Sequence, residues 1–238
     1  ISTDGGFIVE ESSTKKRFKT MLLSSAKYWL GTGKIAREYL VYYGANNDQI
    51  FDYPFSSLDE KDILPEIMRY EDKVQLRNKL SIKGKKVIIT VGQFIHRKGL
   101  DILLNAFRKI KKDDIELLII GGSESRLIEE FGEEIPYGVT ILPFMSKDEL
   151  FEYYKAADLF VLPTREDVWG LVINEAMACG LPVITTEKCG SGAELIEEGR
   201  NGYIVPVEDV DALAMSMKKI LESNSLEEKG IESLRIIE

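Results

Sequence analysis

Short apolar runs alternate with amphipathic stretches between about residue 85 and residue 221. The runs are rich in Val, Ile and Leu and most end at Gly or Pro, which is typical of strands buried on both faces of a sheet. In the stretches between them, apolar residues recur at helical spacing, as in residues 99–110. The pattern predicts six strands, at residues 86–92, 116–122, 139–142, 158–164, 181–187 and 202–207.

This alternation predicts an α/β fold built on a Rossmann-like, doubly wound parallel sheet, because right-handed crossovers place helices on both faces. The first 84 residues are less regular, with a strand expected at residues 28–30 and helices at residues 34–43 and 70–80. In doubly wound sheets, ligands bind at the carboxyl ends of the strands. The loops that follow the predicted strands are therefore the places to look for chemistry.

The composition narrows the classes of function. The formal net charge of −9 argues against general nucleic-acid binding. The single histidine, His96, leaves no His-rich metal site and no serine-type triad, and two cysteines do not form a disulfide framework, so we expect no metal and a reducing cytoplasm. Lys and Arg concentrate beside apolar residues at positions 14–23, which is typical either of a solvated helix face or of a contact with an anionic membrane surface.

The loop after the first strand of this sheet contains glycine and positive charge. It holds Gly92, Gln93, His96, Arg97 and Lys98 and opens a helix. A helix N-terminus beside two cations is suited to a phosphate or diphosphate. The spacing matches neither the GxGxxG fingerprint nor the Walker loop, which disfavours NAD enzymes and kinases of the standard kinds. We expect Arg97 and Lys98 to contact a diphosphate and His96 to face solvent.

Two carboxylates flank the start of a later helix. Asp167 lies in the loop after the strand at residues 158–164, and Glu175 lies one turn into the helix that begins near Gly170 and Leu171. Free amides at the helix start bind phosphates, and Gly170 would let a ligand approach the backbone. Carboxylates accept hydrogen bonds from vicinal sugar hydroxyls, so a nucleotide-sugar suits both kinds of group. Two other interpretations remain open: Asp167 caps the helix, or Glu175 is held by a local salt bridge.

The run from residue 87 to residue 221 resembles the second domain of retaining glycosyltransferases of family 4, which have the GT-B architecture. The matching segments are VGQFIHRKGLDILLNAF, LLIIGG, ILPFMSKDELFEYYKAADLFVLPT, EDVWGLVINEAMACGLPVITT and GYIVPVEDVDAL, in this order. The resemblance implies transfer of a hexosyl group from a UDP- or GDP-linked sugar, with retention and without metal or other cofactor. The implied acceptor is a glycan or a lipid-linked sugar, in the synthesis of cell-surface polysaccharide.

The resemblance also assigns roles within a carboxylate-x7-carboxylate signature. The second acid of the family binds the ribose and corresponds to Glu175, whereas the first acid contacts the transferred sugar and corresponds to Asp167. Backbone groups in the loop at Phe144 correspond to those that hold the nucleobase. Two positions depart from the family, which has Glu in place of Asp167 and Arg in place of Gln93. An alternative is therefore a non-catalytic nucleotide-sugar-binding module on the same fold.

The same resemblance predicts the domain organisation. Residues 1–55 resemble the end of a first, acceptor-side domain and its connector, residues 56–84 form a linker helix region, residues 85–222 form the nucleotide-sugar-binding domain, and residues 223–238 form a C-terminal tail. With most of the first domain missing, we expect the strand at residues 28–30 to lack partners and to present an open edge. We also expect a cytoplasmic location, no nucleic-acid partner, and a peripheral contact with the inner face of the membrane through the missing first domain.

Overall fold

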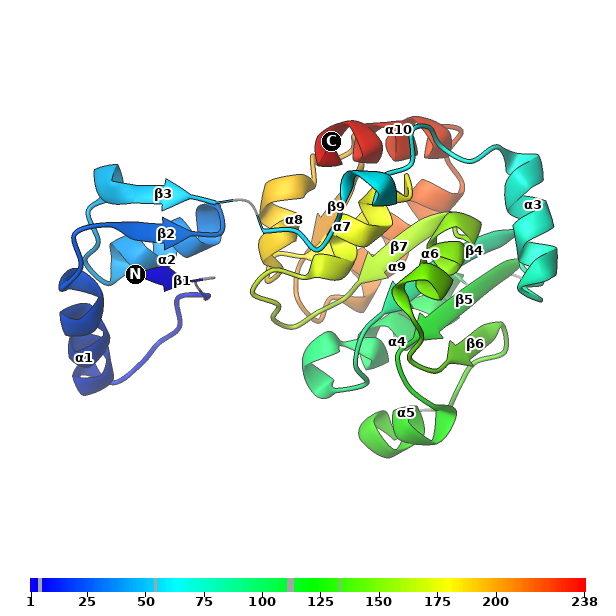
Figure 1. Ribbon diagram of the computed structural model, residues 1–238. Coiled ribbons are helices and arrows are strands. Elements are labelled where there is room, and N and C mark those ends of the chain that lie inside the picture. Colours follow the sequence, from blue (N-terminus) through cyan, green and yellow to red (C-terminus); the bar gives the residue numbers. More distant parts are fainter. Residues whose placement is uncertain (4–5, 54, 111–113, 133) are drawn as a thin grey trace.

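The computed structural model describes residues 1–3, 6–53, 55–110, 114–132 and 134–238. The strands of these residues form a sheet of three strands near the N-terminus and a sheet of six strands in the rest of the chain (Figure 1). Between the two sheets, the chain runs as a connector across the larger domain before it enters that domain's sheet.

The six-stranded sheet is parallel throughout and follows the order β6-β5-β4-β7-β8-β9. Its strands are β4 (Lys86–Val91), β5 (Ile115–Ile120), β6 (Val139–Leu142), β7 (Leu159–Leu162), β8 (Val183–Thr186) and β9 (Gly202–Val205). The chain builds one half outward from β4 to β6 and then returns to add β7 beside β4. This confirms the predicted doubly wound sheet and puts its topological switch point between β4 and β7.

Helices cover both faces of this sheet. They are α3 (Tyr70–Lys79), α4 (Leu100–Ile110), α5 (Glu124–Phe131), α6 (Lys147–Ala156), α7 (Leu171–Ala178), α8 (Gly190–Leu195), α9 (Val210–Leu221) and α10 (Leu226–Ile237). Because side chains alternate along a strand, β4 sends Ile88 into a core with α4 and α9, and Val87 and Ile89 into a second core with α6 and α7. The helix starts follow local signals, since Ser146 and Glu149 form the capping box that begins α6.

The N-terminal sheet corrects the prediction of an unpaired strand. It consists of β1 (Ser2–Thr3), β2 (Trp29–Gly31) and β3 (Ile50–Asp52), and β2 is its central strand, hydrogen-bonded in parallel to both neighbours. The helices α1 (Ser13–Ser24) and α2 (Lys34–Tyr42) accompany it. One face forms a small core around Trp29 and Leu40, whereas Leu30 and Phe51 on the other face are exposed. The part of this sheet that stays uncovered is therefore one of its faces, whereas β2 is paired on both sides.

Helix α1 carries the basic segment at residues 14–23. It is described throughout, and none of its residues is buried. Phe18, Met21 and Leu22 are exposed, and so are Lys15 and Arg17. Both interpretations of this segment, a solvated helix face and a contact with an anionic membrane surface, therefore stay predictions. No helix among the described residues combines the length and the hydropathy that crossing a bilayer requires.

The residues on either side of the predicted domain belong to it structurally. In the linker region, α3 packs on α6, and a turn of 3₁₀ helix, η2 (Glu60–Asp62), precedes α3. Two further such turns are η1 (Asn47–Gln49) and η3 (His96–Lys98).

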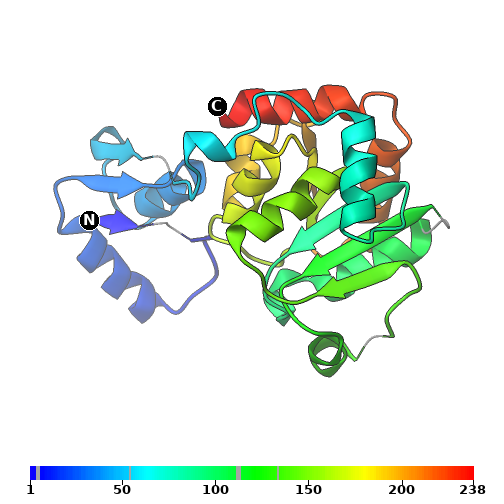
Figure 2. The same ribbon diagram turned by 45° about the vertical axis from the view of Figure 1, so that its right-hand side comes forward.

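Residues 223–238 differ from the predicted tail, because α10 packs along α7 (Figure 2). Leu234 is buried and Ser233 donates a 2.7 Å hydrogen bond to the carbonyl oxygen of Leu181. Apolar positions at helical spacing give α10 a face that this packing removes from water.

Candidate functional site

The loops after β4 and β7 meet at the topological switch point. The Arg97 guanidinium donates a 2.7 Å hydrogen bond to the carbonyl oxygen of Glu166, and the amide of Arg165 donates to the carbonyl oxygen of Arg97 at 2.8 Å. The crevice between such loops is where doubly wound sheets bind their ligands. The two loops singled out in the sequence are therefore parts of one site.

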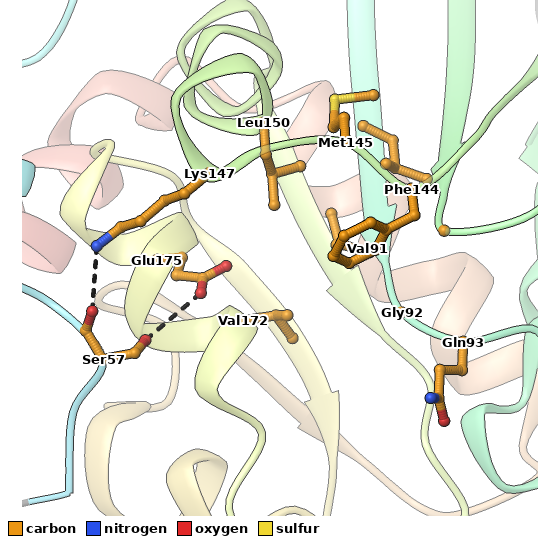
Figure 3. A pocket seen from close by; sticks show the side chains of 12 residues that line it. Ser57, Val91, Gly92, Gln93, Phe144, Met145, Lys147, Leu150, Val172 and Glu175 are labelled. Carbon is orange, nitrogen blue, oxygen red and sulfur yellow. Dashed lines mark hydrogen bonds between the residues drawn. The ribbon is translucent and has the colours of Figure 1, made fainter.

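A cavity of about 320 Å³ opens at this edge of the sheet (Figure 3). Its lining comes from the ends of β4 and β5, the loop after β6, the helices α6 and α7, and the connector. The residues are Ser57, Val91, Gly92, Gln93, Ile120, Gly121, Phe144, Met145, Lys147, Leu150, Val172 and Glu175. Four of the predicted site residues, Gly92, Gln93, Phe144 and Glu175, are thus brought together. The Phe144 side chain is 89% exposed, so it stands at the rim of the cavity.

Glu175 presents a half-buried carboxylate to this cavity. It accepts a hydrogen bond from the Tyr154 hydroxyl at 3.1 Å and a longer one from the Ser57 hydroxyl at 3.4 Å. Burial raises the pKa of Glu175 above its ordinary value, and the hydrogen bond from Tyr154 and the charge of Lys147 act in the opposite direction. In the described part of the chain, Glu175 is in no ion pair, so the salt-bridge interpretation is wrong. Its oxygens retain acceptor capacity for ligand hydroxyls.

Asp167 pairs with the cations of the first loop. The Lys98 ammonium lies 2.5 Å from one carboxylate oxygen, and the Arg97 guanidinium lies 3.8 Å from the other. The side chains of Asp167 and Lys98 are only 13% and 14% exposed. Gly170 occupies the N-cap position of α7, and the described partners of the Asp167 carboxylate are Lys98 and Arg97 rather than an amide of α7, so the interpretation of Asp167 as a helix cap is wrong. The Lys98–Asp167 pair lies beside the cavity, since a Cβ on Gly92 would meet the Lys98 side chain at 3.7 Å.

The structure gives its own reason for a glycine at position 170, apart from the predicted approach of a ligand. Its φ of +88° lies in the left-handed region, and a Cβ placed there would meet the sulfur of Cys189 at 2.9 Å. The residue is buried, so glycine is required by packing and backbone conformation rather than by the approach of a ligand. Leu171 follows it as the first residue of α7. Binding of phosphate by the amides at this helix start stays a prediction.

The glycine-rich segment at residues 188–194 also serves packing. A Cβ on Gly190 would meet the carbonyl oxygen of Val168 at 1.9 Å, and Gly190 begins the short helix α8. Trp169 packs edge-on against Phe55 of the connector, with ring centroids 6.0 Å apart, and donates to Asn174 at 3.1 Å. These contacts hold Trp169 against the connector and α7, outside the described lining of the cavity.

A second ion cluster, which the sequence does not reveal, braces the first loop. Arg165 binds both carboxylate oxygens of Asp101, at 2.7 and 3.0 Å, and donates to the carbonyl oxygen of His96 at 2.6 Å. It also pairs with Glu208 at 2.8 Å. His96 itself is exposed, as predicted. Because the partners of Arg165 come from two segments far from it in sequence, residues 96–101 and Glu208, no local spacing could have indicated the cluster. Its position just behind Arg97 and Lys98 fixes the backbone that carries both cations.

Comparison with known proteins gives a consistent result. Residues 72–235 match the family model described as glycosyl transferases group 1. The chain is 31% identical over 171 residues to the D-inositol 3-phosphate glycosyltransferase of Mycobacterium marinum. The matched region covers 67% of this chain and 36% of that protein. The chain is also 30% identical over 158 residues to the N-acetyl-alpha-D-glucosaminyl L-malate synthase of Bacillus anthracis, covering 65% of this chain and 41% of that protein. The chain thus spans well under half the length of these relatives.

Solved structures resemble the chain over nearly its whole length. Sucrose-phosphate synthase from Thermosynechococcus elongatus has a TM-score of 0.76 at 26% identity, covering 96% of this chain and 57% of that one. HepE from Anabaena, solved in complex with UDP and glucose, has a TM-score of 0.75 at 20% identity, covering 95% of this chain and 62% of that one. The second likeness shows a shared fold.

Proposed function

The chain belongs to the family of glycosyl transferases group 1, and we propose that it contributes the donor-binding half of a retaining hexosyltransferase. The donor would be a UDP- or GDP-linked sugar, and the acceptor a glycan or a lipid-linked sugar in cell-surface polysaccharide synthesis. The observation that carries this proposal is the pairing of a carboxylate in a cavity, Glu175, with a cation pair beside it, Arg97 and Lys98, at the switch point of the sheet. HepE, which shares the fold, was solved in complex with UDP and glucose, which supports a nucleotide-sugar as the ligand.

The proposed roles follow from the chemistry of the groups. Glu175 would accept hydrogen bonds from the ribose hydroxyls, and backbone groups beside Phe144 would hold the nucleobase. Arg97 and Lys98 would stabilise the charge that grows on the diphosphate as it leaves, while an acceptor hydroxyl attacks the same face of the sugar. Asp167, which holds Lys98 in place, would contact the transferred sugar. These cations would take the place of a metal ion, and we further propose a cytoplasmic location with a peripheral contact with the inner membrane face.

A non-catalytic nucleotide-sugar-binding module is the second candidate. The observation in its favour is Gln93, an uncharged residue that lines the cavity. With Lys98 already paired to Asp167, the diphosphate subsite has less free positive charge than two cations would provide. A module of this kind binds the donor and never hydrolyses it, so release of free sugar from the bound donor separates the two candidates.

The chain should bind a nucleoside diphosphate without a divalent cation, because Arg97 and Lys98 supply positive charge at the switch point. Ligand at 100 times its dissociation constant should stabilise the fold by about 2.7 kcal/mol. Thermal unfolding with UDP, GDP and ADP, each with EDTA or with magnesium, measures this. An absence of any shift would contradict nucleotide binding, and a shift that needs magnesium would contradict the metal-free site.

Asp167→Asn should separate binding of the nucleotide from binding of the sugar. The amide removes the negative charge 2.5 Å from Lys98, so affinity for the free nucleoside diphosphate should stay equal or rise. Affinity for the intact donor should fall by about tenfold, because a charged hydrogen bond to the sugar is lost. Calorimetry with UDP and UDP-glucose, or with the GDP-linked pair, checks both. Glu166→Gln, an exposed neighbour, is the control; if it reproduced the effect, the sugar contact would belong to Glu166 instead.

A further inference from the structure

Tyr154 is a buried tyrosine with one polar contact that matters to the site. It lies on α6, is 0% exposed, and its ring packs against Phe151 and Phe160 with centroids 5.9 Å away in each case. In this apolar setting a phenylalanine would fill almost the same space. The hydroxyl has a partner, however: it donates a 3.1 Å hydrogen bond to Oε2 of Glu175. A buried hydroxyl requires such a partner, since an unpaired one costs free energy.

The contact leaves one side of the Glu175 carboxylate directed to the cavity. Tyr154 holds Oε2 from the protein interior. Among the described residues, Oε1 meets only the long 3.4 Å contact from Ser57 on the cavity wall (Figure 3). A hydrogen bond of that length is weak, so a ligand hydroxyl can displace it. The rigid phenol on α6 therefore fixes the direction in which a flexible glutamate on α7 presents its free oxygen.

The charge of Glu175 depends on the same contact. The groups that face it are Lys147 on α6, Asp62 on η2 and Tyr154, and the Cys179 thiol at the end of α7 lies close to both Tyr154 and Glu175. Burial raises the pKa of Glu175, whereas a hydrogen bond donated to the ionised carboxylate favours that form. Removal of the phenol hydroxyl therefore makes the carboxylate easier to protonate. A protonated Glu175 has lost acceptor strength for hydroxyls.

We propose that Tyr154 is a positioning residue that orients Glu175 toward the two vicinal hydroxyls of a ribose and keeps it an acceptor there. The proposal rests on the proposed function, because it takes a ribonucleotide as the ligand of this cavity. Tyr154 touches no substrate; it acts through Glu175. The competing view, in which Tyr154 only fills the core beside Phe160, predicts that its hydroxyl is irrelevant to nucleotide affinity.

Tyr154→Phe should weaken nucleotide binding with little change in the fold. The dissociation constant, measured by calorimetry at neutral pH with whichever of UDP, GDP and ADP binds the unmodified chain best, should rise by about tenfold. Tyr153→Phe is the matched control, since this neighbouring tyrosine on α6 is only half-buried and stands outside the described lining of the cavity. It should leave the dissociation constant unchanged.

Two further readouts distinguish positioning from packing. With the 2′,3′-dideoxy form of the same nucleotide, the penalty of Tyr154→Phe should disappear, because no ribose hydroxyls remain to be oriented. On lowering the pH, binding to Tyr154→Phe should fail at a higher pH than binding to the unmodified chain. A defect of packing alone would weaken both nucleotides equally and leave the pH dependence unmoved.

The outcomes separate the two levels of inference. If the unmodified chain binds none of the three nucleotides, the proposed function fails. If it binds one, and Tyr154→Phe binds it with unchanged affinity and pH dependence, the positioning role is overturned while the proposed function stands. Should Tyr154→Phe fail to fold, Tyr154→Met, which fills the buried space with a flexible side chain, carries the same test. Equal loss with the ribose and dideoxy nucleotides would overturn the role as well.

Discussion

Replacing Glu175 with alanine should raise the dissociation constant of a nucleoside diphosphate by at least about tenfold, since each charged hydrogen bond to a ribose hydroxyl contributes about 1.5–3 kcal/mol. The carboxylate lines the cavity and its only described partners are the hydroxyls of Tyr154 and Ser57. A ligand therefore need not break an ion pair to reach it. Isothermal calorimetry of the alanine variant measures the effect. Glu175→Gln, which keeps an acceptor for Tyr154, separates loss of charge from loss of the side chain.

Asp148→Ala provides the matched control for charge. Asp148 is an exposed carboxylate in the first turn of α6, so its loss changes the net charge equally without touching the cavity. Its nucleotide affinity should equal that of the unmodified chain. Unchanged nucleotide affinity in Glu175→Ala would contradict the role of this residue in binding the ribose. Equal losses of affinity in both variants would show that the effect comes from the net charge and not from a contact.

The pH dependence of stability distinguishes Glu175 from an ordinary structural carboxylate. Because its pKa is raised in the folded state, the group stabilises the fold at pH below its unfolded value, and this contribution is lost as the pH rises through the raised pKa. At neutral pH the buried charge therefore gives no stability of this kind. Glu175→Ala should fold at neutral pH and should lose this part of the pH dependence of stability. The same samples should show the weakened nucleotide binding.

Replacing Asp158 with alanine should destabilise the chain by about 3–5 kcal/mol, because it leaves buried cations without their counter-charge. Arg77 on α3 is 4% exposed, and its Nη2 lies 2.7 Å from the Asp158 carboxylate, whose own side chain is 12% exposed. Lys73 lies 3.5 Å from the other oxygen, and burial already lowers its pKa. The carboxylate also accepts the amide of Val87 on β4 at 2.8 Å. Unfolding by urea measures the loss.

The control for this prediction is an exposed ion pair between α3, which carries Arg77 and Lys73, and α6, the helix that ends just before Asp158. Lys79 on α3 and Glu152 on α6 form an ion pair at 2.8 Å with side chains that are 70% and 34% exposed. Lys79→Ala should cost no more than about 1 kcal/mol, since water screens such pairs. Similar losses from Asp158→Ala and Lys79→Ala would show that α3 is not anchored by the buried cluster, and that residues 56–84 serve only as a linker.

Local patterns were sufficient for most of the second domain. The six strands and the capping box at Ser146 depend on residues that are close in sequence. So do Asp167 and Glu175, whose spacing places one in a loop and the other in a helix. Periodicity reports which face of each element is apolar, and α/β connections leave few arrangements of such elements. The parallel sheet and the edge that carries the site therefore follow from the sequence.

Contacts between distant segments were decided only by the tertiary structure. The two partners of β2 arrive from residues 2–3 and 50–52, and α10 returns to cover α7, so neither is visible in a local pattern. The pairing of Asp167 with Lys98 and the hydrogen bond from Tyr154 to Glu175 join residues 69 and 21 positions apart. An apolar or charged side chain specifies that it needs a partner, whereas the geometry of packed strands and helices specifies which partner comes within reach.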